Sequence, residues 1–289
     1  MEDLKGGSPM RYNDIEVTLT NYKNIFEGYL PEVQDEIRSA IMDNTPIGMY
    51  IDECSKDAYK LGQIRCAMRE FIDPEYIDVI MSGTTIFYIR MGMFAKVDMS
   101  GILQYIGVLS EKHLEKVAQL CYIGVDISKM DFTRINDKIF DIVCKGLIQK
   151  YPMWLLQDIK VNDEGYVKLL MQGLRLGFDI HPFLDEEWSS ELLVRLFTLD
   201  RDIYTKVLQY VNNKTDVDVL MGVIECIKAG VDITPIMGKY SDGYDLYDSY
   251  QLTTLLTSAS QGLDISKALN FRLTDSEMLR VIKEENNIV

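Results

Sequence analysis

The stretch Gly230-Val231-Asp232-Ile233-Thr234 is one copy of a phrase that recurs along the chain. Three further full copies share its order of glycine, apolar residue, aspartate and isoleucine: Gly124-Val125-Asp126-Ile127-Ser128, Gly177-Phe178-Asp179-Ile180 and Gly262-Leu263-Asp264-Ile265-Ser266. Weaker copies are Lys96-Val97-Asp98-Met99-Ser100, Ile72-Asp73-Pro74 and Arg201-Asp202-Ile203, and Tyr151-Pro152-Met153 fills one place without an aspartate. Neighbouring phrases lie 23 to 32 residues apart. Such self-similarity is typical of helical-repeat proteins.

The residues before each phrase have the periodicity of an amphipathic helix. Leu220, Val223, Ile224 and Ile227 repeat at helical spacing before Gly230. Glycine adopts the left-handed conformation without steric cost, and the apolar residue after it packs back on the last turn in a Schellman cap. The phrase therefore predicts a helix that ends at its glycine.

The aspartate of each phrase is predicted to cap a second, short helix, such as one over 127–130. The predicted structural caps are Gly124, Asp126, Gly177, Asp179, Gly230, Asp232, Gly262 and Asp264, with Asp98 in a weaker copy. We prefer this structural role to a catalytic or metal-binding one, because the aspartates occur once per repeat at a helix junction.

One helix pair cannot bury its apolar face alone, so the repeats are expected to stack. We predict an all-α fold, a right-handed α/α solenoid of repeats of roughly 23–32 residues with a distinct N-terminal segment. Residues 1–44 are expected to form a leader or arm and the first helix, and 45–289 a single continuous solenoid domain. Ile15, Val17 and Leu19 alternate with polar residues, which favours a short strand or an extended arm. The last helix, roughly 274–285, has the polar outer face of a terminal repeat.

The recurring phrase resembles the Gly-Leu-Asp-Val-Ser core of short helical-repeat proteins encoded by anaerobic gut bacteria and their mobile elements. The resemblance covers about residues 45–285, and it implies a fold rather than an activity. The phrase also resembles the Gly-Ala-Asp turn that ends an ankyrin repeat. The chain lacks the Thr-Pro-Leu-His signature of ankyrin repeats and has a shorter spacing, so it is ankyrin-like without being an ankyrin protein.

The charge of the chain excludes several classes of partner. The 289 residues include 30 basic and 45 acidic side chains, a formal net charge of −15. Direct binding to nucleic acid needs clustered basic side chains, and anionic membranes repel acidic surfaces, so we expect neither partner. The five cysteines are widely spaced, which argues against disulfides and zinc and favours the cytoplasm. The sequence contains no stretch of about 18 uncharged apolar residues, so it predicts no membrane-spanning helix.

Catalytic signatures are absent from the sequence. It contains no phosphate-binding glycine loop, nucleophile elbow or zinc-protease motif. The two histidines, His113 and His181, are expected to have surface or capping roles. We therefore expect a protein that is not an enzyme, with no catalytic residues, cofactor or metal; an enzyme with a site between repeats is the less favoured alternative.

Two segments are candidates for partner binding. The first is Asp185-Glu186-Glu187-Trp188, where an exposed Trp188 beside carboxylates is suited to anchor a basic partner; the favourable interaction of acidic groups with a helix dipole also explains these residues. The second is a tyrosine- and aspartate-rich segment in the longest repeat interval, comprising Tyr240, Asp242, Tyr244, Asp245, Tyr247, Asp248 and Tyr250. Exposed tyrosines supply contact area at interfaces, and the alternative is a structural loop whose tyrosines pack on neighbours.

Together these features predict a protein-binding repeat protein. Its expected partner is a protein with a basic surface, which the acidic charge would attract. A concrete version is an inhibitor that mimics nucleic-acid charge and blocks a nucleic-acid-handling protein such as a phage-defence nuclease. The alternative is a structural or self-assembling module, which exposed apolar ends of the solenoid would favour.

Overall fold

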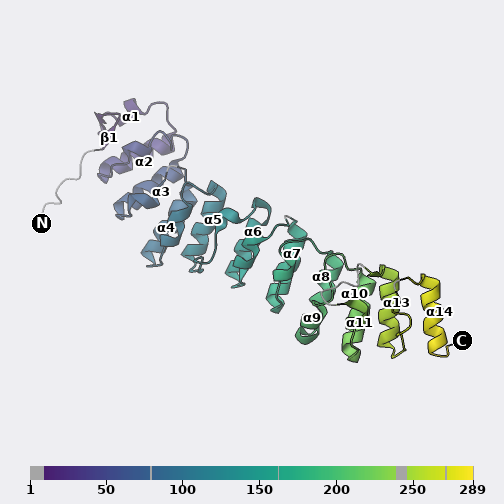
Figure 1. Cartoon of the computed structure of the whole chain (residues 1–289). Helices are drawn as coiled ribbons and strands as arrows, with labels where there is room; N and C mark the ends of the chain where they lie inside the picture. Colours follow the sequence, from purple (N-terminus) through teal and green to yellow (C-terminus); the bar gives the residue numbers. More distant parts are fainter. Residues whose placement is uncertain (1–9, 79, 162, 239–245, 271, 289) are drawn as a thin grey trace. The chain divides into compact units, whose positions relative to one another are not determined.

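A computed structural model describes residues 10–78, 80–161, 163–238, 246–270 and 272–288 (Figure 1). The regular secondary structure of these residues is helical apart from one small hairpin, so the prediction of an all-α chain is confirmed. None of the described helices is long and apolar enough to cross a membrane. Contacts divide the chain into two compact units, unit 1 (residues 1–157) and unit 2 (residues 158–289). A single continuous domain over 45–289 stays a prediction.

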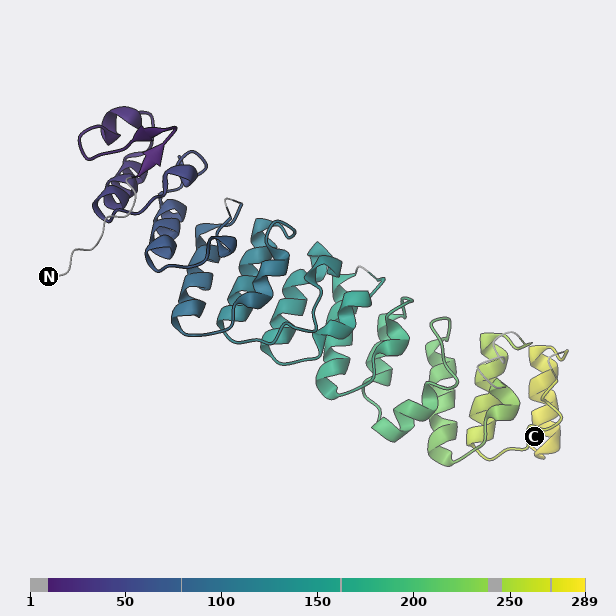
Figure 2. The same ribbon diagram turned by 60° about the vertical axis from the view of Figure 1, so that its left-hand side comes forward.

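Unit 1 contains a hairpin followed by a row of helices that lie side by side (Figures 1 and 2). Each of α2 to α5 contacts the next helix in the row. The elements are β1 (Arg11–Tyr12), β2 (Ile15–Glu16), α1 (Tyr22–Ile25), α2 (Pro31–Met42), α3 (Ala58–Arg69), α4 (Gly83–Phe94), α5 (Glu111–Tyr122) and α6 (Asp137–Ile148). Short 3-10 helices connect them: η1 (Gly48–Tyr50), η2 (Pro74–Tyr76), η3 (Ser100–Tyr105), η4 (Phe132–Arg134) and η5 (Met153–Asp158). The sequence left a short strand or an extended arm as alternatives near Ile15. The structure has the strand, because Ile15 lies in β2, which pairs with β1.

Unit 2 continues the alternation of long helices and short connections. Helix α10 contacts α8, α9 and α13, and α13 contacts α14. The elements are α7 (Glu164–Leu176), η6 (His181–Phe183), α8 (Ser190–Leu196), α9 (Arg201–Val207), α10 (Val217–Ala229), α11 (Thr234–Met237), α13 (Ser249–Ser260) and α14 (Asp275–Glu285). A Cβ added at Gly222 on α10 would lie 2.8 Å from Cβ of Leu256 on α13, so this glycine permits the close approach of the two helices.

The same turn ends the long helices of both units. A residue with φ between 55° and 79° follows α2, α3, α4, α5, α6, α7, α10, α13 and α14: Asn44, Phe71, Lys96, Gly124, Lys150, Gly177, Gly230, Gly262 and Asn287. The next residue donates its backbone N–H to the carbonyl five positions earlier, as in Val125 to Leu120 at 3.0 Å. This is the hydrogen bond of a Schellman cap. The cap therefore also forms at turns where another residue stands in the place of glycine.

The core lies between successive helices and beneath the turns. After α4, α5, α6, α7 and α10 the third residue beyond the left-handed one is apolar and buried: Met99, Ile127, Met153, Ile180 and Ile233 are at most 6% exposed. Gly92 and Gly146 make room for two of these side chains, because a Cβ at either position would lie within 2.5 Å of the sulfur of Met99 or Met153. The repeated turn thus also places a core residue.

One local prediction is wrong. The residues after Asp126 do not form a helix over 127–130; they form a turn at 128–129, followed by η4. The residues after Asp264 likewise form a turn. The buried side chain of Ile127 ties the chain to the core immediately after the aspartate, and a second aspartate, Asp131, accepts the N–H of Thr133 at the start of η4.

Candidate functional site

The acidic candidate segment, Asp185-Glu186-Glu187-Trp188, forms a loop of unit 2 whose backbone is hydrogen-bonded by the Tyr166 hydroxyl. The Tyr166 hydroxyl donates to the carbonyl oxygens of Phe183 at 2.9 Å and Glu186 at 3.1 Å. Trp188 is only 6% exposed and its ring meets that of Phe183 edge-on, 4.9 Å between centroids. The expectation that Trp188 is exposed is therefore wrong, because the indole helps to fasten the loop to the core.

The carboxylates of this loop remain at the surface. Asp185, Glu186 and Glu187 are exposed, and Asp185 forms an ion pair with Lys160 at 2.7 Å, both side chains largely in solvent. An exposed ion pair of this kind contributes little to stability. The loop thus presents negative charge on a fixed backbone, without an aromatic anchor.

The tyrosine- and aspartate-rich segment is described only in part. Tyr240, Asp242, Tyr244 and Asp245 lie outside the described residues. Of the others, Tyr247 is buried and Asp248 caps α13, where it accepts the N–H of Gln251 at 2.9 Å in a capping box. Tyr250 is 53% exposed. Tyr247 is therefore a core residue and Asp248 the N-cap of α13, whereas Tyr250 lies at the surface.

The repeated aspartates bind the turns that follow α4, α5, α7, α10 and α13. The backbone N–H two residues on donates to one carboxylate oxygen at 2.9–3.1 Å, for Asp98, Asp126, Asp179, Asp232 and Asp264. Hydrogen bonds from Ser128 hold the pKa of the Asp126 carboxyl below its usual value, and bonds from Thr234 do the same at Asp232. These carboxylates are exposed, so they stay ionised and add to the surface charge.

The two histidines occupy different environments, and neither is paired with a cysteine. His113 is 9% exposed and stacks on Phe140, so its expected surface position is wrong. The exposed His181 has its Nδ1 2.6 Å from the Asp179 carboxylate, beside the turn that this aspartate caps. Both positions favour structural roles.

The cysteines and acidic groups form no reactive cluster in the described part of the chain. Burial raises the pKa of the Cys54, Cys121 and Cys226 thiols to about 11 and that of Cys144 to about 12. The thiolate is the nucleophilic form, so these side chains are unreactive at neutral pH. No group of three histidine, cysteine, aspartate or glutamate side chains among the described residues is placed to hold a metal ion.

Two aromatic rings at the C-terminal ends of α3 and α4 were not singled out by the sequence. Phe71 is 94% exposed and Phe94 is 84% exposed, the two most exposed large apolar side chains described. Together with Glu70, Ile72, Asp73, Arg90 and Met93 they line a pocket of about 350 Å³. The available signal was the alignment of Phe71-Ile72-Asp73 with Gly124-Val125-Asp126, which places a phenylalanine where the phrase has glycine.

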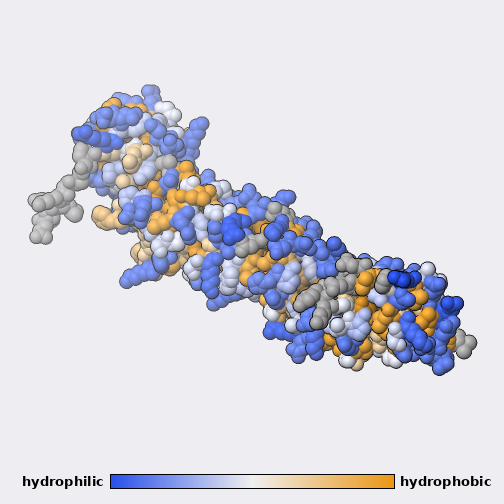
Figure 3. All heavy atoms as spheres, in the orientation of Figure 1, coloured by the Kyte–Doolittle hydropathy of each residue, from blue (hydrophilic) through white to orange (hydrophobic). Residues whose placement is uncertain are grey.

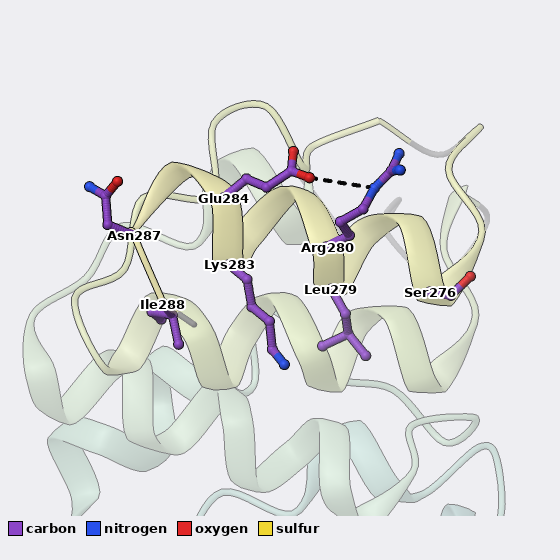
Figure 4. A pocket seen from close by; sticks show the side chains of 7 residues that line it. All are labelled: Ser276, Leu279, Arg280, Lys283, Glu284, Asn287 and Ile288. Atoms are coloured by element: carbon purple, nitrogen blue, oxygen red, sulfur yellow. Dashed lines mark ion pairs between the residues drawn. The ribbon is translucent and has the colours of Figure 1, made fainter.

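Two other concave regions have plainer explanations. A pocket of about 590 Å³ lies at the ends of α5 and α6, where the Lys129 ammonium group lies 4.7 Å from the ring centroid of Trp154 and already occupies that aromatic face. The other region lies on the outer face of α14 (Figure 4). Its lining comes from α14 and the residues directly after it, with Leu279 and Lys283 on one side and the Arg280–Glu284 ion pair on the other. It is the surface of one helix rather than a cleft.

The face of the molecule in Figure 3 shows hydrophilic residues interspersed with groups of hydrophobic ones. No protein-family model, curated protein or solved structure matches the chain.

Proposed function

We propose that the chain is a non-enzymatic, protein-binding helical-repeat protein whose partner has a basic surface. The observation that carries this proposal is the placement of ionised carboxylates on fixed turns. Asp98 and Asp126 in unit 1, and Asp179, Asp232 and Asp264 in unit 2, each sit at the surface at the end of a long helix. Carboxylates held in position attract and orient a basic partner more effectively than the same number on mobile side chains.

We further propose that the repeats form one right-handed α/α solenoid. The contacts between successive helices within each unit support this, as does the recurrence of the same Schellman turn in both units. Solenoids present extended surfaces that suit protein contact.

The partner we favour is a protein that handles nucleic acid, such as a phage-defence nuclease, which the acidic surface would block by mimicking phosphate charge. The net charge of −15 supports this version, because the partner's own nucleic-acid site supplies the basic surface. If this is correct, duplex DNA and the acidic protein compete for the partner. Simultaneous binding of both would rule out charge mimicry while leaving a protein-binding function in place.

The experiment is affinity capture from the native cell, identification of the partner by mass spectrometry, and binding measured with the purified pair. The test variant carries Asp185→Asn, Glu186→Gln and Glu187→Gln, which remove three exposed charges without touching Tyr166 or Trp188. The matched control is Glu284→Gln on the outer face of α14. We expect the triple variant to bind several-fold more weakly and the control to bind normally. Equal affinities for wild type and triple variant would exclude the acidic loop from the interface.

A further inference from the structure

The pocket between the ends of α3 and α4 exposes two aromatic rings that the fold does not use. The Phe71 side chain is almost entirely in solvent at 94% exposure, and that of Phe94 is 84% exposed. A phenylalanine stabilises a fold mainly by burying its ring, which neither residue does here. Both rings line one pocket, and folding does not explain their presence there.

The backbone of Phe71 adopts the conformation that glycine has in other turns of this kind. Its φ of 57° lies in the left-handed region, which is less favourable for a residue with a Cβ than for glycine. Gly124, Gly177, Gly230 and Gly262 fill the equivalent place in the full copies of the phrase. Lys96 and Lys150 adopt the same conformation with charged side chains that water solvates, so the exposed phenyl ring is what distinguishes Phe71 from the other residues without glycine at this turn.

The charged groups of the pocket leave its net character negative. Arg90, the cation in the lining, is 9% exposed and binds both carboxylate oxygens of Glu70, through Nε at 2.8 Å and through Nη2, while Nη1 donates to Gln63. Its charge is thus already balanced. Asp73, also in the lining, forms no ion pair with the residues that the structure describes; its carboxylate accepts the backbone N–H of Glu75 at 3.2 Å.

Further carboxylates lie near this edge. Burial raises the pKa of the Tyr76 hydroxyl, and the negative charges of Glu75, Asp98 and Asp73 raise it further. Three carboxylates therefore act on one phenol in η2, directly beside the pocket-lining Ile72 and Asp73. The pocket combines two uncovered aromatic faces with a surplus of negative charge, which is the chemistry that binds a cationic side chain.

We infer that this pocket receives an arginine side chain from the basic partner. The guanidinium group would lie against the faces of Phe71 and Phe94 with Asp73 as its counter-ion, and its aliphatic stem would contact Met93. Arginine fits better than lysine because its planar, weakly hydrated head stacks on aromatic rings. The inference rests on the proposed function, in that it names how one part of the surface recognises the partner.

The test is ¹⁹F NMR of the full chain labelled with 4-fluorophenylalanine, titrated with N-acetyl-arginine methylamide. The chain has 10 phenylalanines, and Phe71→Ala and Phe94→Ala assign the two resonances of interest by their disappearance. We expect these two resonances to shift with a Kd on the order of 10 mM, as one or two exposed cation–π contacts allow. The buried Phe26, Phe132 and Phe140 serve as internal controls and should not move.

The matched ligand is N-acetyl-citrulline methylamide, which has nearly the same shape without the charge. Citrulline that shifts the two resonances as strongly as arginine would overturn a cation site in favour of an apolar one. The absence of any shift with arginine up to about 50 mM would overturn the inference altogether. Asp73→Asn is expected to weaken the arginine-induced shift about two- to threefold, and an unchanged titration would remove Asp73 as the counter-ion.

Failure here and failure of the proposed function are distinguishable. A partner that binds in a salt-dependent way, and binds Phe71→Ala and Phe94→Ala as tightly as wild type, would leave the proposed function standing and refute the pocket. If arginine binds to the pocket but no protein partner binds in a salt-dependent way, the pocket stands as a cation site and the proposed function is refuted.

Discussion

The imidazole ring of His113 stacks on the phenyl ring of Phe140, with centroids 3.9 Å apart and planes 9° apart. The stack joins α5 to α6 inside unit 1, and the histidine is 9% exposed. Burial lowers the pKa of His113; Lys112 and Lys116 lower it further, whereas Asp137 and Asp141 of α6 oppose the shift. The neutral ring is therefore the form that the folded chain favours.

This stack predicts that unit 1 loses stability in mild acid. The pKa of His113 is lower in the folded than in the unfolded chain, so the unfolded chain binds the proton more tightly. The contribution of the neutral ring is fully present above about pH 6.5 and declines as pH falls below it, by at most about 1.4 kcal/mol per pH unit. Thermal melting between pH 7.5 and 5.5 measures the loss.

The control for this prediction is His113→Phe, which keeps an aromatic ring on Phe140 but cannot be protonated. Its melting temperature should fall less than that of wild type over the same pH interval. If both proteins show the same pH dependence, the titration of His113 makes no contribution.

Asp232→Ala is predicted to lower stability with little effect on partner binding, because the carboxylates of Asp98, Asp126, Asp179 and Asp264 remain on their turns. The Asp232 carboxylate accepts the N–H of Thr234 at 2.9 Å, and its loss leaves this backbone donor at the turn without that partner. The exposed Glu225 on α10 offers a matched control, since Glu225→Ala removes the same charge without removing a cap. Denaturant unfolding should separate the two variants. Unchanged stability in Asp232→Ala would count against its capping role.

Phe71→Gly is predicted to raise stability while weakening partner binding. Glycine relieves the left-handed conformation at φ 57° and sacrifices little packing, because the phenyl ring is exposed, so a gain of about 1 kcal/mol is expected. Lys150→Gly, at the equivalent turn of α6, should be stabilised similarly but bind normally. A variant at Phe71 that is both less stable and fully competent to bind would contradict a functional role for this ring.

Asp52→Asn is predicted to loosen the N-terminal hairpin. The hydroxyls of Tyr12 in β1 and Tyr29 after α1 both donate to one Asp52 carboxylate oxygen, and these bonds lower the pKa of Asp52. Replacing the charged acceptor should cost about 1 kcal/mol. Hydrogen exchange should increase over residues 10–30 and stay constant in α5. Glu53→Gln, which removes a charge one residue away, should leave both regions unchanged.

The recurring phrase made the helix ends predictable. Glycine is the residue that most easily adopts φ > 0, so Gly124, Gly177, Gly230 and Gly262 indicate their turns directly, and the apolar periodicity before them indicates the helices. Asn44 occupies the same turn with a residue that also tolerates φ > 0, whereas Lys96 and Lys150 give no such signal, because lysine has no preference for this conformation.

The candidate sites were less predictable, because exposure depends on the fold. Trp188 sits beside three acidic residues, yet Phe183 and the loop above Tyr166 enclose it. Phe71 and Phe94 have the composition of core residues and lie 23 positions apart, and only the packing of α3 beside α4 brings both into one pocket. His113, flanked by charges in the sequence, is buried because Phe140 lies opposite it.

The affinity of the purified partner as a function of salt tests the acidic-surface proposal most directly. Binding through fixed carboxylates predicts that the dissociation constant measured by calorimetry rises at least tenfold between about 50 and 500 mM NaCl, because the Debye length shortens severalfold. The triple variant Asp185→Asn, Glu186→Gln, Glu187→Gln should show a shallower dependence. An affinity that is the same at both salt concentrations would contradict recognition of a basic surface.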